Sequence, residues 1–236
     1  MDETKRLSKV VAALVPCSRS DAEQYITEGW VRVDGRVVDE PQFRVGSEKV
    51  EVDARASLQP PVSATFLLNK PAGMNTAAAL SQLGAATRWS GDTSGIRRVK
   101  GHSVGLVPLL ELPAMAEGLC VFSQDAGVVR KLRVDARLVE QELVAEVGGT
   151  LVPRGLQRLC GGLVYEGQPL PPARVSWQSE ARLRLAVKNI RPEIVPWMCE
   201  QVGLQVRSLR RIRIGRVPMA GLPPGQWRYL AAGERF

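Results

Sequence analysis

Apolar and polar positions in the first quarter of the chain recur with helical and then strand-like periods. An apolar stripe predicts a helix over residues 5–15; its members are Leu7, Val10, Val11 and Leu14. A second helix follows Pro16, is capped by Ser18 or Ser20 and ends at Gly29. Its expected inward-facing side chains are Ala22, Tyr25 and Ile26. Residues 31–38 then alternate around an Asp-Gly turn signal, so the predicted order is helix, helix, hairpin.

Apolar runs in the rest of the chain are shorter and are interrupted by turn residues. Residues 66–68 predict a strand that runs into a Lys-Pro turn. Residues 109–125 predict an apolar strand, a turn around Glu117-Gly118 and a second apolar strand. In residues 207–216, arginine alternates with isoleucine, which predicts a strand with buried isoleucines on one face and the guanidinium groups of Arg211 and Arg213 on the other.

Charge is distributed unevenly along the chain. The 236 residues carry a formal charge of +8, with a pI near 9.7. Residues 1–58 hold nine basic and eleven acidic side chains, whereas the remaining residues hold 23 and 13. The segment LQPPVSA between these parts favours an extended connector, so we place a linker at 59–64. The positive balance favours polyanions as partners, nucleic acid first and anionic membrane second.

The cysteine and histidine content and the apolar stretches bear on whether the chain has a metal site, a signal peptide or a membrane span. The four cysteines are far apart in sequence and there is one histidine, His102, so no metal site is predicted, and we interpret the cysteines as free thiols of a cytoplasmic protein. The N-terminus lacks the pattern of a signal peptide. The longest apolar stretch, 103–122, is broken by two prolines and two glutamates, so no membrane span is predicted.

The first part of the chain resembles a known RNA-binding module. RLSKVVA, CSRSDAEQYITEGWVRVDGRVV and VGSEKVEVD are similar to the small module first described in a small-subunit ribosomal protein and found at the front of many RNA-modifying enzymes. This resemblance implies that the two helices present Arg6, Lys9, Ser18 and Arg19 to folded RNA. The alternative is a helical hairpin whose basic side chains are only solvated. Because the segment has a net charge of −2, a local basic cluster must outweigh its acids.

The rest of the chain resembles ribosomal RNA pseudouridine synthases of the RsuA/RluF type. The similar stretches are FLLNKPAGMNTA, LVPLLELPAMAEGLCVFSQDAGVVRKL, VEQELVAEVGGTL and VRSLRRIRIGRVPMAGLPPGQWRYL. The resemblance implies an α+β fold, with a small helix–helix–hairpin domain over 1–58 and a larger mixed, mainly antiparallel sheet domain over 65–236. It implies isomerisation of uridine without a cofactor, and makes Lys70 a candidate RNA contact.

The motifs that carry the family's chemistry are altered in this sequence. The family's acidic motif, Gly-Arg-Leu-Asp-x-x-Thr/Ser-x-Gly-Leu, aligns from Leu110 and puts Pro113 at the nucleophilic Asp. In the Lys-x-Tyr motif, Gln141 takes the lysine position and Leu143 the position of the ring that stacks on the extruded base. Pro196 and Trp197 replace an arginine pair, for which Arg191 could partly compensate; Glu111 and Ala116 stand at the Arg and hydroxyl positions.

Two carboxylates could substitute for the missing acid. Glu111 would share a strand face with Pro113, two residues too early. Asp92 lies in GDTSGI, which superficially resembles the acidic motif but reads as a polar loop.

These observations favour a catalytically inactive, monomeric RNA-binding protein on a pseudouridine synthase scaffold. Its expected ligand is structured RNA, ribosomal RNA first, with no cofactor. Nine basic and two acidic side chains over residues 182–216 would add phosphate contacts. Two alternatives stay open: a divergent but active synthase, and a protein-interaction module or ribosome assembly factor whose RNA affinity is secondary.

Overall fold

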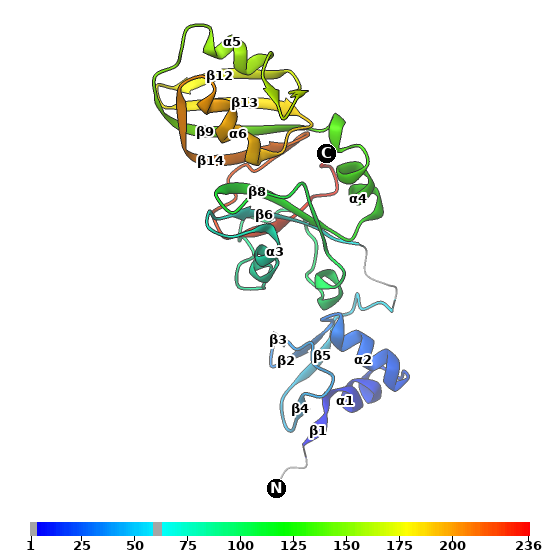
Figure 1. Cartoon of the computed structure of the whole chain (residues 1–236). Helices are drawn as coiled ribbons and strands as arrows, with labels where there is room; N and C mark the ends of the chain where they lie inside the picture. The colour runs from blue at the N-terminus through cyan, green and yellow to red at the C-terminus, as the bar shows by residue number, and fades with distance from the viewer. Residues whose placement is uncertain (1–3, 59–62) are drawn as a thin grey trace. The chain divides into compact units, whose positions relative to one another are not determined.

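The computed structural model describes residues 4–58 and 63–236 and separates the chain into two units (Figure 1). The first runs to Ser63 and also includes Arg97–Leu106; the second contains Ala64–Ile96 and Val107–Phe236. Of the predicted linker, residues 59–62 lie outside the described residues. The sequence did not predict that residues 97–106 pack with the first unit.

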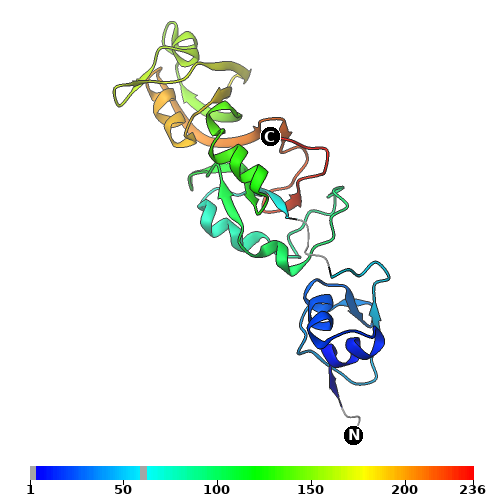
Figure 2. The ribbon, with the colours of Figure 1, turned by 90° about the vertical axis from the view of Figure 1, so that its right-hand side faces the viewer.

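The first unit has two adjacent helices and short strands. Helices α1 and α2 pack against each other (Figure 2). The helices and strands are α1 (Leu7–Leu14), α2 (Arg19–Thr27), β1 (Lys5–Arg6), β2 (Val31–Val33), β3 (Arg36–Val37), β4 (Arg44–Val45) and β5 (Val50–Val52). Strand β2 lies between β3 and β5, and β1 pairs with β4. The buried core consists of Leu7, Val11, Ala22, Ile26, Val31, Val33 and Val45. The predicted order of helix, helix and hairpin is confirmed.

Local chemistry explains where these elements begin and end. The Ser18 hydroxyl accepts from the Asp21 N–H, and the Asp21 carboxylate accepts from the Ser18 N–H, which makes a reciprocal cap on α2. Gly29 ends that helix with φ +71°. Leu14, predicted to lie on the buried stripe, is 53% exposed, because α1 ends there, two residues before Pro16.

Residues 97–106 contribute a basic side chain to the first unit. The Arg97 guanidinium lies 3.3 Å from the centroid of the Trp30 ring and donates to the Glu28 carbonyl oxygen at 2.5 Å. Burial lowers the pKa of Arg97. This contact joins positions 67 residues apart, so no local sequence pattern could indicate it.

The second unit is built on a nine-stranded sheet. Its main strand order is β12-β13-β9-β14-β8-β6-β16, with β15 paired to β14 and β7 to β8. The bounds are β6 (Thr65–Lys70), β7 (Val107–Leu109), β8 (Ala116–Ser123), β9 (Glu140–Gly149), β12 (Ala173–Ser179), β13 (Arg182–Lys188), β14 (Leu204–Ile214), β15 (Val217–Pro218) and β16 (Trp227–Tyr229). Strands β8 and β14 run parallel, and the other pairs are antiparallel. The predicted α+β class with a mainly antiparallel sheet is confirmed.

Short helices and one small hairpin complete this unit. They are α3 (Thr76–Ala79), η1 (Leu80–Gln82), α4 (Ala126–Arg133), η3 (Ala136–Leu138), α5 (Gly155–Cys160), the hairpin β10 (Val164–Tyr165) with β11 (Gln168–Pro169), η4 (Pro192–Ile194) and α6 (Val195–Glu200); η2 (Lys100–Ser103) belongs to the first unit. Helix α6 packs on β14, and α4 packs on β7 and β8 (Figure 1). Every residue of β6 is buried, so the expected strand at 66–68 is confirmed and is longer than predicted.

The turn before β8 differs from its predicted position. Residues 110–115 form the turn, while Glu117 and Gly118 continue the strand. Gly118 has φ +104°, and a β-carbon built on it would lie 2.3 Å from the carbonyl oxygen of Arg211 on the neighbouring strand β14. The glycine therefore permits the close approach of two strands, and it does not mark a chain reversal.

Gly118→Ala is expected to lower the free energy of unfolding by about 2 kcal/mol more than Gly225→Ala. Both glycines have left-handed backbone angles, but no atom lies within 4 Å of a β-carbon on Gly225. The shared conformational cost cancels in the comparison, and the remainder measures the clash with β14. Urea denaturation of the two variants tests this, and equal losses would contradict it.

Candidate functional site

Three of the predicted RNA-binding side chains surround one hollow of the first unit. Arg6, Lys9 and Arg19 line a depression of about 460 Å³ together with Ser8 and Ala12. All three basic residues are exposed, and α1 and α2 pack against each other to bring them together. Arg19 also pairs with Glu23 at 3.1 Å on an exposed surface, where such a pair contributes little. The hollow can therefore offer cations to an anionic ligand.

Ser18, the fourth predicted residue of this group, has a structural role. Its hydroxyl oxygen caps α2, as described above, while the residue itself is exposed. A hydroxyl can accept and donate at once, so the cap leaves its proton for a ligand.

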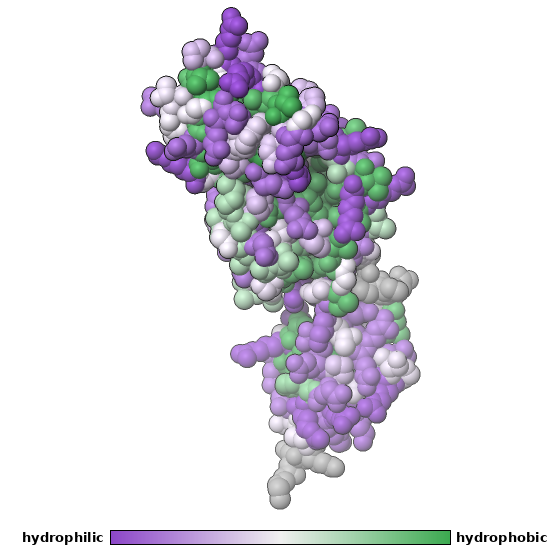
Figure 3. Space-filling model, in the orientation of Figure 1, coloured by the Kyte–Doolittle hydropathy of each residue, from purple (hydrophilic) through white to green (hydrophobic). Residues whose placement is uncertain are grey.

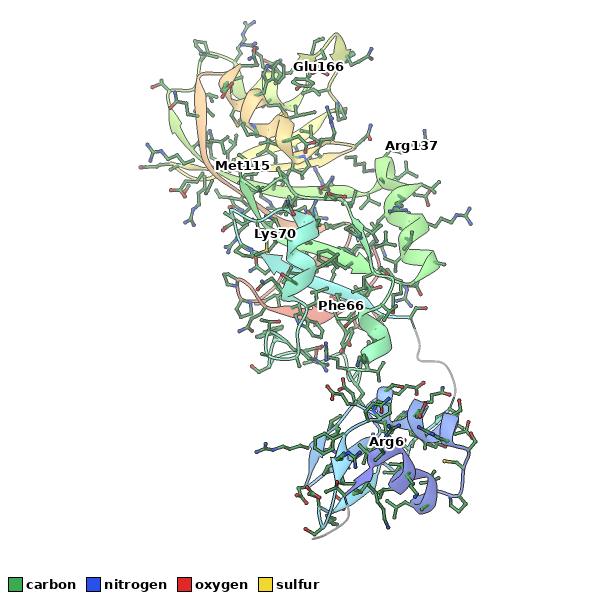
Figure 4. The ribbon with its side chains drawn as sticks, turned by 60° about the horizontal axis from the view of Figure 1, so that its bottom comes forward. Arg6, Phe66, Lys70, Met115, Arg137 and Glu166 are labelled. Carbon is green, nitrogen blue, oxygen red and sulfur yellow. The ribbon has the colours of Figure 1, made fainter. Side chains whose placement is uncertain are left out.

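A second group of ionisable side chains is buried inside the larger unit. Lys70 on β6 and Arg211 on β14 are both fully buried. The Lys70 ammonium donates to the carbonyl oxygens of Pro71 at 3.0 Å, Met74 at 2.5 Å and Ala116 at 2.6 Å. Figure 4 labels Lys70 within the packed ribbon. Because its three protons are used inside the fold, the expected contact of Lys70 with RNA is withdrawn.

Arg211 is held by neutral groups. Its Nε donates to the Leu119 carbonyl oxygen and its Nη1 to Oε1 of Gln141, each at 2.8 Å. Its Nη2 is buried without a hydrogen-bond partner among the described residues. Burial lowers the pKa of Arg211 to about 10, and the neighbouring Cys120 thiol opposes this shift. The predicted phosphate-binding role of Arg211 is therefore also withdrawn, because the strand buries this guanidinium group.

Cys120 on β8 lies beside these two cations. The charges of Arg211 and Lys70 favour its thiolate, but burial raises its pKa on balance. In the described part of the chain no carboxylate forms an ion pair with Lys70 or Arg211. The charge of Glu117 also acts on Lys70, but that carboxylate pairs with Arg210 at 2.9 Å. Burying two cations together without an ion pair of their own costs free energy.

The turn 110–115 contains the position at which the sequence predicted a missing acid. Pro113 is partly buried there, and Glu111 is exposed. Leu112 is fixed on both sides of its backbone: its N–H donates to the Thr76 hydroxyl at 3.0 Å, and that hydroxyl donates to its carbonyl oxygen at 3.1 Å. The prediction that Glu111 and Pro113 share a strand face was wrong, because this segment is a turn in which Leu110 has φ +47°.

Two other sequence positions of the expected reaction centre, Leu143 and Gln141, are buried and carry no charge. Leu143 is fully buried on β9, opposite Arg211 in the strand register. The Gln141 side chain is buried between Arg211 and the Ile190 carbonyl oxygen, to which it donates at 3.1 Å. Asp92 accepts from the Arg88 guanidinium at 2.7 Å and from the Ser94 N–H at 2.9 Å, so it fastens its own loop.

One known protein family matches the first part of the chain, and several known proteins are similar to nearly all of it. The model of the S4 domain matches residues 5–50. RluF of Escherichia coli K12, a dual-specificity RNA pseudouridine synthase, is 26% identical over 238 residues, which are 99% of this chain and 78% of RluF. The chain is a homologue of the RluF/RsuA-type pseudouridine synthases.

Further relatives agree with this assignment. An RNA pseudouridine synthase of Aquifex aeolicus is 27% identical, covering 97% of this chain and 94% of its own length. SVR1, a chloroplast protein of Arabidopsis thaliana named as a ribosomal large-subunit pseudouridine synthase, is 28% identical over 91% of the chain, which spans 55% of that relative's length. The crystal structure of a pseudouridylate synthase superposes with a TM-score of 0.60 at 19% identity, over 96% of both chains, which shows a shared fold.

In this RluF homologue, Arg213 and Arg191 differ in their availability. Arg213 donates to Glu140 at 2.7 Å and to Glu142 at 2.6 Å. Arg174 and Arg184 pair with the same two glutamates, so the network spans β12, β13, β9 and β14. Burial disfavours the ionised form of Glu142, but hydrogen bonds from Arg184 and Arg213 hold its pKa below the ordinary value. The expectation that Arg213 is open to phosphate is corrected, since acids already neutralise it.

Arg191, in contrast, is exposed and lies 3.9 Å from Glu193, also at the surface. Pro196 and Trp197 lie on α6, where the Trp197 ring contacts Tyr165 edge-on at 4.9 Å. At these two positions, where the resemblance led us to expect a pair of arginines, this chain has a proline and a tryptophan. The tryptophan ring packs against Tyr165.

The sequence analysis did not identify Thr76 and Cys120 as part of this buried group. Cys120 lies beside the two cations, Lys70 and Arg211, and Thr76 contacts Cys120. Both residues lie in stretches that carry the family resemblance, but their positions in the sequence indicated no role for either of them at the site. Their roles depend on contacts between segments far apart in the chain, such as Thr76 with Leu112, 36 residues on. Among the described residues no group of three or more metal-ligating side chains occurs. None of the helices described is long and apolar enough to cross a bilayer.

Proposed function

We propose that this protein binds structured ribosomal RNA and does not isomerise uridine. The observation that supports this is the state of the buried arginine. Nη2 of Arg211 has no hydrogen-bond partner in the part of the chain that the structure describes, and the acidic motif supplies Pro113 in a turn in place of a carboxylate. The isomerisation expected from the resemblance needs an ionised carboxylate against the sugar, which a proline side chain cannot replace.

The requirement for a stacking platform points the same way. An extruded base needs an aromatic face, and Leu143 offers a buried aliphatic side chain at the corresponding position. The candidate substitutes are poorly placed for the task. Glu111 is exposed, and Asp92 is held by Arg88. These facts favour the inactive protein over an active, divergent synthase.

RNA binding is supported by the hollow of the S4 domain. Arg6, Lys9 and Arg19 present three cations in one place, although their segment carries a net negative charge. Phosphate groups are the ligand that such a cluster fits. Ser18 and the exposed Arg191 complete the proposed set. We expect the protein to act as a monomer in the cytoplasm.

A chemical map of pseudouridine in ribosomal RNA tests the proposal. Cells that contain the protein and cells from which it has been removed should give the same map. A uridine that is modified in the first cells alone would establish an active enzyme. In that case Glu111→Gln, which removes a carboxylate without changing its size, would show whether this residue supplies the acid.

Salt dependence separates RNA binding from a role in protein contacts. Affinity for phosphates falls steeply between about 50 and 200 mM salt, whereas a largely apolar protein contact does not. A binding curve for fragmented ribosomal RNA that is flat over this range would favour an interaction module or an assembly factor.

A further inference from the structure

A basic surface of the larger unit is not used by the site described above. Helix α4 ends in RKLR, and η3 follows almost directly. Arg130, Arg133 and Arg137 are exposed on this α4–η3 surface. Within the described residues, none of the three guanidinium groups forms an ion pair or hydrogen bond. Figure 4 labels Arg137 at the outer edge of this unit.

This lack of acid partners distinguishes the α4–η3 surface from the sheet of the same unit. There, Arg174, Arg184 and Arg213 are neutralised by Glu140 and Glu142. On the α4–η3 surface, the one acid is Asp135, which lies 3.9 Å from Lys131. Arg130 and Arg133 are three residues apart and lie on the same side of α4, and Arg137 follows in η3 after a break in the helix at Asp135. The positive charge is therefore concentrated and available.

Apolar side chains lie among these cations. Val134 is 69% exposed and Leu138 is 58% exposed. In Figure 3, hydrophobic residues appear among hydrophilic ones at the position that α4 has in Figure 1. Arginines in the last turn also stabilise a helix through its dipole, which accounts for Arg130 and Arg133. This stabilisation of the helix does not explain why Arg137, four residues beyond the end of α4, is basic. It also does not explain why the aliphatic side chains of Val134 and Leu138 are exposed.

A hollow adjoins this surface. The segment η3 contacts β13, and two residues after Leu138 the side chain of Glu140 lines a depression of about 380 Å³. Pro171 and Pro172 supply apolar walls, and the exposed Lys188 supplies a further cation. Hydrogen bonds from Arg213 and Arg174 hold the pKa of Glu140 below its ordinary value against the effect of burial, so this acid is already neutralised.

We propose that the α4–η3 surface is a second RNA-binding surface, which holds the sugar–phosphate backbone separately from the S4 domain. The arginines fit phosphate oxygens, and the aliphatic side chains and the proline-lined hollow fit sugars or an unstacked base. This inference rests on the proposed RNA-binding function. It adds a surface to the residues that the S4 domain contributes.

The test compares two full-length double variants in filter binding to end-labelled, fragmented ribosomal RNA. Arg133→Gln with Arg137→Gln is expected to weaken binding about tenfold and to reduce the slope of log K against log salt by about 1.5, because two phosphate contacts are lost. Arg154→Gln with Arg158→Gln removes two exposed arginines at and within α5 and serves as the charge-matched control. It should change the affinity less than twofold.

The outcomes separate this inference from the proposed function. If Lys9→Glu with Arg19→Glu weakens binding but Arg133→Gln with Arg137→Gln does not, the second surface is wrong and RNA binding stands. If the wild-type protein does not bind the RNA, the proposed function fails. Equal losses in both arginine pairs would indicate net charge alone and overturn the inference. Equal affinity for polyglutamate would overturn the choice of RNA as the ligand.

Discussion

Reversing two charges, by Lys9→Glu together with Arg19→Glu, is expected to weaken binding to ribosomal RNA by about tenfold or more. Both side chains line the same hollow of the S4 domain, so the change removes two cations and places two anions where phosphates would lie. Each lost phosphate contact also removes counterion release, so the salt dependence should become shallower. Filter binding at several salt concentrations measures both effects.

A matched variant controls for net charge. Arg36→Glu with Lys49→Glu makes the same change in charge on the same unit but outside the hollow. It should retain most of the affinity. Circular dichroism must show intact helices in both variants, because Arg19 belongs to the first turn of α2. Equal affinity of the two double variants would remove the hollow from the RNA-binding site.

The second large effect concerns the buried cations. Cys120→Asp is expected to be tolerated, whereas Cys199→Asp should lower the free energy of unfolding by at least about 3 kcal/mol more. Both cysteines are buried, and burial raises the pKa of each thiol, that of Cys199 to about 12. At position 120 the new carboxylate would meet Arg211 and Lys70, whose charges already act on Cys120. At position 199 the charge that acts on the thiol is that of Glu200, which would repel the new carboxylate.

The pH dependence gives this prediction a specific signature. A carboxylate at position 120 would have a folded-state pKa depressed by its two cations. Its stabilising effect is then present above the unfolded value of about 3.9 and is lost as the pH falls through the folded pKa. Cys120→Asn, the neutral control, should lack this loss. If the aspartate and asparagine variants have the same stability at neutral pH, the two cations do not lack a counter-ion.

Sequence patterns predicted local structure well where local chemistry decides it. The cap at Ser18, the helix end at Gly29 and the Asp-Gly hairpin depend on a few neighbouring residues, and all are present. The prediction of a turn at Gly118 was wrong. This glycine is needed for the close approach of β14, a strand that lies about 90 residues later in the chain.

The arginines of the candidate sites also show that a local pattern does not reveal contacts with distant segments of the chain. Strand alternation predicted that Arg211 and Arg213 would face solvent, but the pattern does not state which face a neighbouring strand covers. Arg211 is inside, and Arg213 is neutralised by two glutamates on β9. Arg6, Lys9 and Arg19, which the resemblance implied would face RNA, are all exposed.

The packing of Arg97 on Trp30 has a practical consequence for dissecting the protein. A fragment cut at residue 58 would leave the indole without its guanidinium partner and the Glu28 carbonyl without its donor. Such a peptide would represent the S4 domain incompletely, and a loss of its affinity would not report on the basic hollow. Expression of the intact polypeptide, with point substitutions in place of truncation, keeps this guanidinium–indole contact in every measurement.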